Sequence, residues 1–315
     1  MGASPKYLWW NGQIVPWDDA SVHVTNLGWS TIGAVFEGIK AYWSSERQEL
    51  YALQFAEHYT RFLDSMRLQR MAPRWTAHEL IEASLELLRA NDVRHDAYVR
   101  PIAYFGDTTW FSSCMDAPTE VFIWTTPFES VLGAGRTSKA CVSSWTRLGD
   151  NMMSPRIKCL SNYQNSRMAL IEAKRHGYNY PILLNDQQKV TEGPASCLFI
   201  VRDGVAITPA ATSGILESIT RRTLLQMCRE DLNIPTEERE VDRTELYVAS
   251  EIFFCGTGAE IQPVIEVDGY QVGGGTIGPI TRRLEAAFHT MVRGDSRHEH
   301  WRTPLYRTAD AKVSL

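Results

Sequence analysis

Hydrophobic and polar positions along the first part of the chain follow two periods, which predict a mixture of strands and helices. Apolar residues three and four positions apart predict one helix over 55–66 and a second helix capped by Thr76. Asn11-Gly12, inside an apolar stretch, is the signature of a two-residue hairpin turn. Strands are predicted by alternating or continuous apolar runs at 7–16, 22–24, 34–42, 50–53, 97–104 and 120–126.

The same mixture continues after a glycine-rich segment at 132–136, which is typical of a linker. Asp203-Gly204 and Asp268-Gly269 predict two further hairpin turns. Strands are expected at 139–145, 181–184, 198–201 and 252–254, and helices at 161–176, 217–232, 243–249 and 279–292.

These boundaries predict an α+β chain of two domains, for which 315 residues leave enough room. A smaller N-terminal domain is expected over 1–131, a linker over 132–137 and a larger C-terminal domain over 138–315. The tail from Gly294 is polar, and we expect it to be poorly ordered.

Composition argues against nucleic-acid-binding, zinc-binding and membrane-spanning proteins. Hydrophobic residues make up 44% of the chain and charged residues 22%, as in an ordinary globular protein. The formal net charge of −5 argues against a general nucleic-acid binder, which usually has a basic face. The six cysteines form no C-x-x-C pair and no zinc-like spacing with histidine, and no apolar run approaches the ~18 residues of a membrane span. We therefore expect a cytoplasmic protein without a metal site, a membrane span or a nucleic-acid partner.

Two charged residues in the second half of the chain are candidates for chemistry. Lys158 lies just before Ser161, the expected N-cap of a helix. The positive end of that helix disfavours a charged amine, and a lysine with a lowered pKa is a nucleophile that forms a Schiff base with an aldehyde. Glu192 follows in a T-E-G-P turn. Each residue taken alone is more typical of a solvated surface position.

Two small-residue motifs offer binding sites for a ligand. S-I-T-R at 218–221 opens a helix, whose first N–H groups and Thr220 hydroxyl suit a phosphate, although plain capping by Ser218 or Thr220 explains the same residues. C-G-T-G-A-E at 255–260 is a turn whose backbone could approach a ligand, with Thr257 as a hydroxyl donor, or simply a tight turn.

A third motif, G-G-G-T-I-G at 273–278, fits a dinucleotide-binding fingerprint. Too few residues follow Gly278 to build the βαβ unit that this fingerprint requires. A glycine turn before a helix that starts at Pro279 is the better interpretation, and an NAD-dependent oxidoreductase is the remote alternative.

Longer stretches from about Tyr7 to about Met291 carry a family resemblance. These stretches are Y-L-W-W-N-G-Q-I-V, V-F-E-G-I-K, E-H-Y-T-R, Y-V-R-P, V-S-S-W, R-I-K-C-L-S-N-Y, A-K-R-H-G-Y and G-T-G-A-E-I-Q-P. In this order they resemble the class IV aminotransferases, pyridoxal-phosphate enzymes of fold type IV, and most closely the branched-chain amino-acid aminotransferases.

The resemblance implies a fold, an activity and an assembly. The fold would be the two-domain fold of D-amino-acid and branched-chain aminotransferases, with a small N-terminal α/β domain and a larger C-terminal domain that has a β-barrel-like core. The activity would be ping-pong transfer of an amino group between a branched-chain or related hydrophobic amino donor and a 2-oxo acid, either 2-oxoglutarate or pyruvate. The assembly would be a homodimer.

The resemblance also implies a set of cofactor-binding residues. Lys158 would carry the Schiff base with pyridoxal 5′-phosphate and move the substrate proton. Glu192 would pair with the pyridine nitrogen, and Tyr163 would hydrogen-bond the phenolic oxygen. The phosphate would be bound by Arg61, which together with His58 lies off the apolar face of its predicted helix, by the amides of Ile219 and Thr220, and by Thr257.

Substrate recognition is implied less directly. Carboxylate groups would be bound by Tyr98, Arg100 and the turn amides of Thr257 and Gly258, and the side-chain pocket would be lined by Phe36 and Tyr163. The chain departs from the branched-chain pattern where Thr31 and Val131 replace aromatic residues and Cys197 replaces asparagine. Smaller residues at Thr31 and Val131 predict a wider pocket.

The wider pocket leaves alternatives open. One is an (R)-selective amine or D-amino-acid transaminase, and a less favoured one is an enzyme like the aminodeoxychorismate lyases of the same class. Arg100 favours a transaminase that uses an acidic co-substrate. A non-catalytic binding protein on the same scaffold is disfavoured by Lys158 and Glu192.

Overall fold

The computed structural model describes residues 4–106, 117–294 and 297–307. Internal contacts divide the chain into two compact units. The first comprises Met1–Ser130, Ile157–Ser161 and Met291–Leu315, and the second comprises Val131–Arg156 and Asn162–Thr290. Two segments expected in the larger C-terminal domain, Ile157–Ser161 and Met291–Leu315, therefore group with the first unit. The domain boundaries expected from the sequence stay a prediction.

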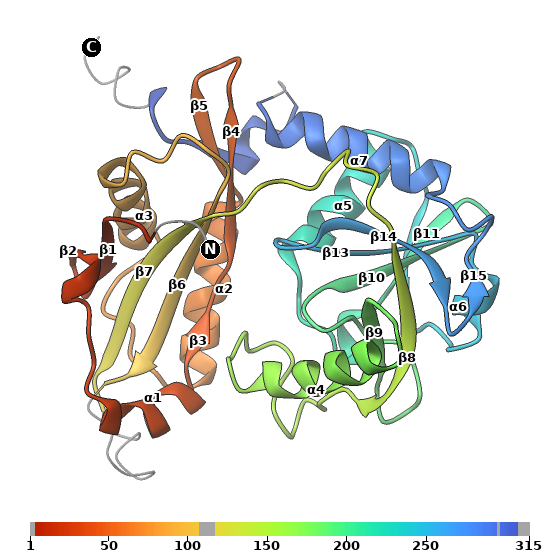
Figure 1. Ribbon diagram of the computed structural model, residues 1–315, viewed down its shortest axis with the longest axis horizontal. Coiled ribbons are helices and arrows are strands. Elements are labelled where there is room, and N and C mark those ends of the chain that lie inside the picture. The colour runs from red at the N-terminus through yellow and green to blue at the C-terminus, as the bar shows by residue number, and fades with distance from the viewer. Residues whose placement is uncertain (1–3, 107–116, 295–296, 308–315) are drawn as a thin grey trace. The chain divides into compact units, whose positions relative to one another are not determined.

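The first unit is built on one antiparallel sheet (Figure 1). Its strand order is β16-β5-β4-β6-β7-β1-β2, and β3 pairs with β6. The strands are β1 (Tyr7–Trp10), β2 (Gln13–Pro16), β3 (Val35–Phe36), β4 (Ile39–Ser44), β5 (Glu49–Leu53), β6 (Ala97–Phe105), β7 (Thr119–Pro127) and β16 (Arg302–Pro304).

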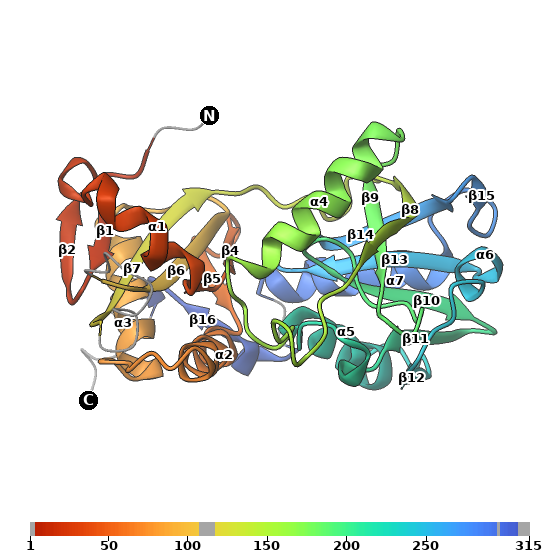
Figure 2. The same ribbon diagram turned by 90° about the horizontal axis from the view of Figure 1, so that it is seen from below.

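Two amphipathic helices, α2 (Phe55–Leu68) and α3 (Ala77–Ala90), cover one face of this sheet (Figure 2). The buried core includes Tyr59 and Phe62 of α2, Leu88 of α3, and Val99 and Ile123 of the sheet. Each such side chain contributes about 1.5–3 kcal/mol by its removal from water. In β6 and β7 every second residue is buried in this core, and the residues between them are half-buried on the opposite face.

The second unit contains a mixed sheet in the order β12-β11-β10-β13-β14-β8-β9, with β15 on β14. Its strands are β8 (Ser138–Thr146), β9 (Tyr180–Leu184), β10 (Cys197–Arg202), β11 (Val205–Pro209), β12 (Thr236–Arg239), β13 (Glu251–Gly256), β14 (Glu260–Val267) and β15 (Tyr270–Gln271). Its helices are α4 (Asn162–Arg175), α5 (Ile219–Glu230), α6 (Glu245–Val248) and α7 (Pro279–Val292). Leu198, Ile200, Ile252 and Phe254 lie in its buried core.

The predicted helices over 55–66 and 279–292 are confirmed, and so is the cap of α3. The Thr76 hydroxyl accepts the N–H of Glu79, whose carboxylate accepts the N–H of Thr76 in return. The turns at Asn11-Gly12 and Asp203-Gly204 join β1 to β2 and β10 to β11.

Two local predictions are wrong. The stretch 22–24 forms no strand: Val24–Asn26 is a 3₁₀ turn, where His23 accepts the N–H of Thr25, and α1 (Leu27–Ile32) follows it. The tail from Gly294 was expected to be poorly ordered, yet over 297–307 it contains β16, and Trp301 is buried. Positions 295–296 and 308–315, to which the same prediction applied, lie outside the described residues.

The tail is ordered because a buried carboxylate accepts hydrogen bonds from the backbone N–H groups of the tail. Glu49 accepts the N–H groups of Leu305, Tyr306 and Arg307 at 3.0, 2.8 and 2.8 Å. β16 also extends the sheet antiparallel to β5. The backbone N–H groups of the tail are therefore paired with Glu49. The polar composition of the tail does not reveal this partner.

Candidate active site

Lys158 is held beside β3 by its own backbone. Its N–H donates to Ser65 Oγ at 3.2 Å, and its carbonyl accepts the N–H of Phe36 at 3.0 Å. The ammonium Nζ lies 4.7 Å from the centre of the Phe36 ring. The side chain is half-buried, so the sequence-predicted lysine projects from a fixed backbone against an aromatic wall.

A buried ionic cluster follows Phe36 directly. Glu37 has a fully buried side chain that accepts bonds from Arg61 Nε at 2.7 Å and Arg61 Nη2 at 2.9 Å. His58 Nδ1 lies 2.7 Å from the same carboxylate. The expectation that His58 lies off the apolar face is wrong, because the cluster draws it into the interior.

Charges set the protonation states in this cluster. Burial acts to raise the pKa of Glu37, but the charge of Arg61 and the hydrogen bonds from His58 and Arg61 oppose it, and the pKa lies well below its usual range. Burial lowers the pKa of His58, Glu37 partly opposes this, and the charges of Arg61 and Lys158 lower it further. His58 is therefore neutral at pH 7, and its Nδ1–H donates to the ionised Glu37.

Tyr98 and Arg100 lie on the half-buried face of the same sheet. A Cβ atom on Gly38 would come within 1.9 Å of the Tyr98 hydroxyl, so only glycine leaves room for this ring beside Glu37. The Arg100 guanidinium carbon lies 5.7 Å from the Tyr98 ring centre and 5.2 Å from that of Trp124. In the first unit, therefore, Lys158 contacts Phe36, and Glu37, which follows Phe36, binds Arg61. Tyr98 packs against Gly38, the next residue, and lies within cation–π distance of Arg100.

Thr31 is placed differently from these residues. It lies on α1 with an exposed side chain, and its hydroxyl donates to the carbonyl of Leu27 at 2.6 Å. The end of α1 does reach the lysine segment, because Cys159 Sγ donates to the carbonyl of Ile32 at 3.3 Å. The role of Thr31 as a pocket wall stays a prediction.

In the second unit Glu192 is the centre of a separate cluster. Its carboxylate lies 2.7 Å from Arg147 Nη2, and both side chains are only 7% exposed. The Leu216 N–H donates to Glu192 Oε2 at 3.3 Å, and the Cys197 thiol lies 3.7 Å from the same oxygen. Burial raises the pKa of Cys197 to about 12, and the Glu192 charge adds to this, so Cys197 remains a neutral thiol.

Helix α5 begins shortly after Leu216, whose N–H donates to Glu192. Ser218 caps the helix, because its hydroxyl accepts the N–H of Arg221 at 3.2 Å. Within the part of the chain that the structure describes, no group accepts a hydrogen bond from the N–H of Ile219 or Thr220. Ser218 thus caps the helix, and the N–H groups of Ile219 and Thr220 are still available to bind an anion.

The turn with Thr257 and Gly258 joins β13 to β14. A Cβ on Gly256 would lie 3.4 Å from the carbonyl of Ala195, so this turn packs on the segment that leads from Glu192 into β10. Val131 reaches the same turn, since its N–H donates to Glu260 Oε2 at 2.7 Å.

Tyr163 is the second residue of α4. The next turn of this helix is tied to the Arg147 segment, because the Asn165 amide donates to the Thr146 carbonyl at 3.0 Å. The second unit thus groups Glu192 with α5, with the Thr257 turn and with Val131, and it links α4 to the residue before Arg147.

The glycine motif at 273–278 leads into α7 without offering an anion site. Glu251 already occupies the start of that helix and accepts the N–H groups of Ile280 and Thr281 at 2.9 and 2.7 Å. A Cβ on Gly278 would come within 2.1 Å of the Glu251 carboxyl carbon, so the glycine makes room for this cap.

The residues that the structure describes contain neither a metal-binding cluster nor a membrane-spanning helix. No group of three or more His, Cys, Asp or Glu side chains is arranged to hold a metal ion there. None of the helices in this part is both long and apolar enough to cross a membrane.

Three residues in the clusters were missed by sequence reasoning: Glu37, His58 and Arg147. The signal for Glu37 was a charge inside the apolar run 34–42. For His58 it was the spacing of three to Arg61 on one helix face. Arg147 follows β8 with no local signal, because its partner Glu192 comes from another part of the chain.

Comparison with known proteins identifies the family. The model of the amino-transferase class IV family matches residues 34–267. A protein of Aquifex aeolicus named as a probable branched-chain-amino-acid aminotransferase is 40% identical over 304 residues, which are 96% of this chain and 98% of that protein. The branched-chain-amino-acid aminotransferase of Escherichia coli K12 is 37% identical over 294 residues, which are 92% of this chain and 94% of that protein.

Solved structures agree with these sequences. The crystal structure of the branched-chain amino acid aminotransferase from Thermobaculum terrenum in its PLP form has a TM-score of 0.94 and 46% identity, and the match covers 96% of this chain and 99% of that one. The alternative of a dinucleotide-dependent oxidoreductase finds no support in these matches. The chain belongs to the class IV aminotransferases, which are pyridoxal-phosphate-dependent transaminases of fold type IV.

Proposed function

We propose that this transaminase transfers an amino group between a branched-chain or related hydrophobic amino donor and a 2-oxo acid such as 2-oxoglutarate or pyruvate. The observation that carries the proposal is similarity over nearly the whole chain to proteins named as branched-chain aminotransferases. The retained lysine and glutamate, each in a fixed environment, support it.

The residues of both clusters suit pyridoxal 5′-phosphate. An amine, a buried carboxylate and helix-start N–H groups complement its aldehyde, ring nitrogen and phosphate. Lys158 would hold the cofactor covalently, Glu192 would pair with its ring nitrogen, and Tyr163 would bond its phenolic oxygen. The phosphate ligands would be Arg61, Ile219, Thr220 and Thr257. Bound there, the cofactor supplies an electron sink for the carbon next to the substrate nitrogen.

The chain itself would supply proton transfer and orientation. The Lys158 amine would take the proton from the substrate carbon next to nitrogen as a general base and would then give it back as a general acid. Arg147 holds the Glu192 carboxylate in place, because their oppositely charged groups meet at 2.7 Å in the interior.

Substrate groups would be recognised by the remaining predicted residues. Tyr98, Arg100 and the turn amides of Thr257 and Gly258 would bind carboxylates, and Phe36 would form an apolar wall beside the Lys158 amine. The smaller side chains of Thr31 and Val131 would leave a wider pocket, which would admit an (R)-amine or a D-amino acid.

We further propose a homodimer in the cytoplasm. Four large apolar side chains are exposed close together in sequence on the first unit: Val22, Val24, Leu27 and Ile32. Several large apolar side chains exposed within one short segment are typical of an interaction surface. Sedimentation velocity at micromolar concentration should give twice the mass of one chain, and a monomer would refute the dimer.

The test of the function is a visible absorption spectrum of the reconstituted enzyme. We expect a band near the visible edge that shifts when L-leucine is added, followed by amino transfer to 2-oxoglutarate. A shift with (R)-1-phenylethylamine or D-alanine but not with L-leucine would favour the wider-pocket alternative. Lys158→Ala should show neither the band shift nor turnover, with a loss of at least about 10²–10⁴-fold. Undiminished transamination by this variant would overturn the role of Lys158.

A further inference from the structure

Arg100 occupies an unusual place for a cation. It is half-buried in β6, and its Nε is buried without a hydrogen-bond partner. Within the described ranges 4–106, 117–294 and 297–307 it forms no ion pair, although buried arginines are normally paired. Two aromatic rings lie close to its guanidinium: Tyr98 precedes it on the same face, and Trp124 lies directly opposite on β7.

Trp124 itself contacts a further aromatic ring. The Trp17 ring, from a 3₁₀ turn over Trp17–Asp19, lies 6.0 Å from the Trp124 ring at an angle of 51°. Cross-strand pairing keeps Arg100 and Trp124 on the same face of the sheet. The guanidinium therefore lies against aromatic surface, within cation–π distance of two rings.

This arrangement separates two functions of the guanidinium. Its faces suit the aromatic rings, whereas its in-plane N–H groups suit the two oxygens of a carboxylate. Aromatic surface also excludes water, which strengthens the attraction between the guanidinium and a bound anion.

We propose that Trp124, which contacts Trp17, is a positioning residue that holds Arg100 for the second carboxylate of a dicarboxylic substrate such as 2-oxoglutarate. This inference rests on the proposed function, in which Arg100 binds a substrate carboxylate. It adds the reason for selectivity: a monocarboxylate such as 4-methyl-2-oxopentanoate has no second carboxylate for Arg100, so its binding depends less on Trp124.

The test compares Trp124→Leu with the wild type in the cofactor-loaded enzyme. The first readout is the ratio of kcat/KM for 2-oxoglutarate to kcat/KM for 4-methyl-2-oxopentanoate. The second readout does not need turnover. It is the ratio of the calorimetric Kd values for glutarate, which has two carboxylates, and for 4-methylpentanoate, which has one. Leucine keeps apolar bulk and removes the ring, so we expect both preferences for the dicarboxylate to fall about 5- to 30-fold.

Matched variants separate this role from general packing. Phe122→Leu removes a ring from the same face of β7, opposite Ile102 and against Tyr104, and should leave both ratios within twofold. Trp124→Phe keeps an aromatic face and should restore most of the preference. In an Arg100→Gln background, Trp124→Leu should have no further effect on either ratio.

The outcomes distinguish the inference from the proposed function. An equal loss for both substrates in Trp124→Leu, an unchanged ratio, or no glutarate binding by the wild type would overturn the inference. A wild type that transaminates neither oxo acid would refute the proposed function. The inference would still be supported in that case if Trp124→Leu weakened glutarate binding and spared 4-methylpentanoate.

Discussion

The guanidinium of Arg61 donates from Nε and Nη2 to the two carboxylate oxygens of Glu37, at 2.7 and 2.9 Å. The Glu37 side chain is fully buried, and that of Arg61 is 13% exposed. A bidentate pair in this setting fixes the plane of the guanidinium. Arg61, the expected phosphate ligand, is thus oriented by a residue that follows the pocket-wall residue Phe36 directly in the chain.

Glu37→Gln should destabilise the protein strongly. The variant leaves the Arg61 cation largely buried without its counter-charge, which costs about 3–5 kcal/mol of the free energy of unfolding. Urea denaturation at pH 7 measures this. Asp64→Asn on the same helix is the control, because the Asp64–Arg67 pair is exposed and should contribute less than about 1 kcal/mol. Similar losses in the two variants would contradict the structural assignment.

His58 should make stability depend on pH between neutrality and mild acid. Its pKa is lowered in the folded state, chiefly by burial, so the unfolded state binds a proton first as the pH falls through about 6.5. Folding stability is then lost as the pH falls below that value. His58→Gln should reduce the slope of stability against pH by up to about 1.4 kcal/mol per pH unit.

Urea titrations of wild type and His58→Gln at pH 7, 6 and 5 measure that slope. His23→Gln, which changes an exposed histidine, serves as the control and should keep the wild-type slope. Parallel stability curves for wild type and His58→Gln would show that His58 is not the titrating group.

The elements that the sequence predicted well are those whose signal is local. The helix over 55–66 carries its apolar spacing within itself, and the start of α7 coincides with Pro279. The Thr76 capping box is likewise complete within four residues. Candidate residues such as Lys158 and Glu192 came from short motifs and a family resemblance, and their assigned roles stay predictions.

The rest depended on partners far apart in the chain. Glu37 meets His58 and Arg61 across 21 and 24 positions, and nothing in V-F-E-G-I-K specifies which cation it binds. The tail was predicted to be disordered from its polarity, although Glu49 binds it across more than 250 positions. Tertiary hydrogen bonds of this kind have no periodicity to detect.

Arg147 and Glu192 should behave as a coupled pair. Each single neutralisation, Arg147→Gln or Glu192→Gln, leaves one buried charge unpaired and should cost about 3–5 kcal/mol. The double variant removes both charges and should be less destabilised than the sum of the two singles by at least about 1 kcal/mol. Thermal and urea unfolding of the four cofactor-free proteins measure this coupling. Additive losses would show that the two groups do not interact.

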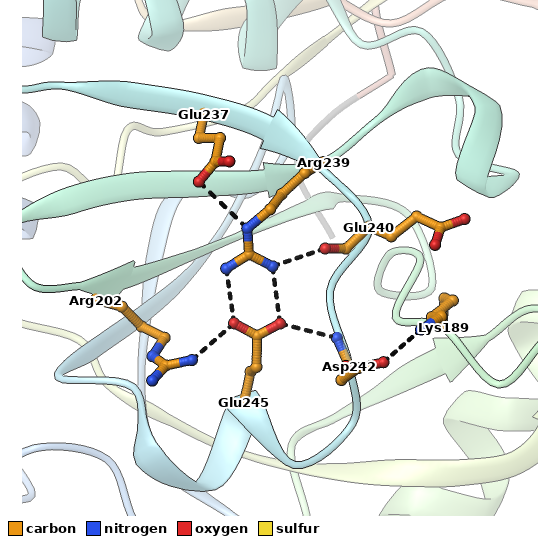
Figure 3. Close-up of polar contacts among 7 residues, drawn as sticks. All are labelled: Lys189, Arg202, Glu237, Arg239, Glu240, Asp242 and Glu245. Atoms are coloured by element: carbon orange, nitrogen blue, oxygen red, sulfur yellow. Dashed lines mark hydrogen bonds and ion pairs between the residues drawn. The ribbon is translucent and has the colours of Figure 1, made fainter.

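Another carboxylate of the second unit, that of Glu245, binds two arginines (Figure 3). Glu245 accepts from Arg239 Nη1 and Nη2 at 2.8 and 2.7 Å, and from Arg202 Nη1 at 2.9 Å. The N–H of Asp242 adds a fourth bond at 3.0 Å. Hydrogen bonds from Arg239 are the largest cause that lowers the pKa of Glu245 to about 2, and burial opposes them.

Glu245→Gln should therefore cost about 1.5–3 kcal/mol of stability at pH 7, because it replaces charge-assisted bonds by neutral ones. A lowered folded pKa stabilises the protein above the unfolded value near 4.3 and loses that contribution as the pH falls toward 2, so the gap between variant and wild type should narrow below about pH 4.5. Urea denaturation at pH 7, 4 and 3 follows this gap. Glu240→Gln is the matched control: Glu240 takes part in the network of Figure 3 only through its carbonyl, so its variant should stay within about 0.5 kcal/mol of wild type. A gap for Glu245→Gln that stays constant with pH would mean that ionised Glu245 does not hold Arg239 and Arg202 together.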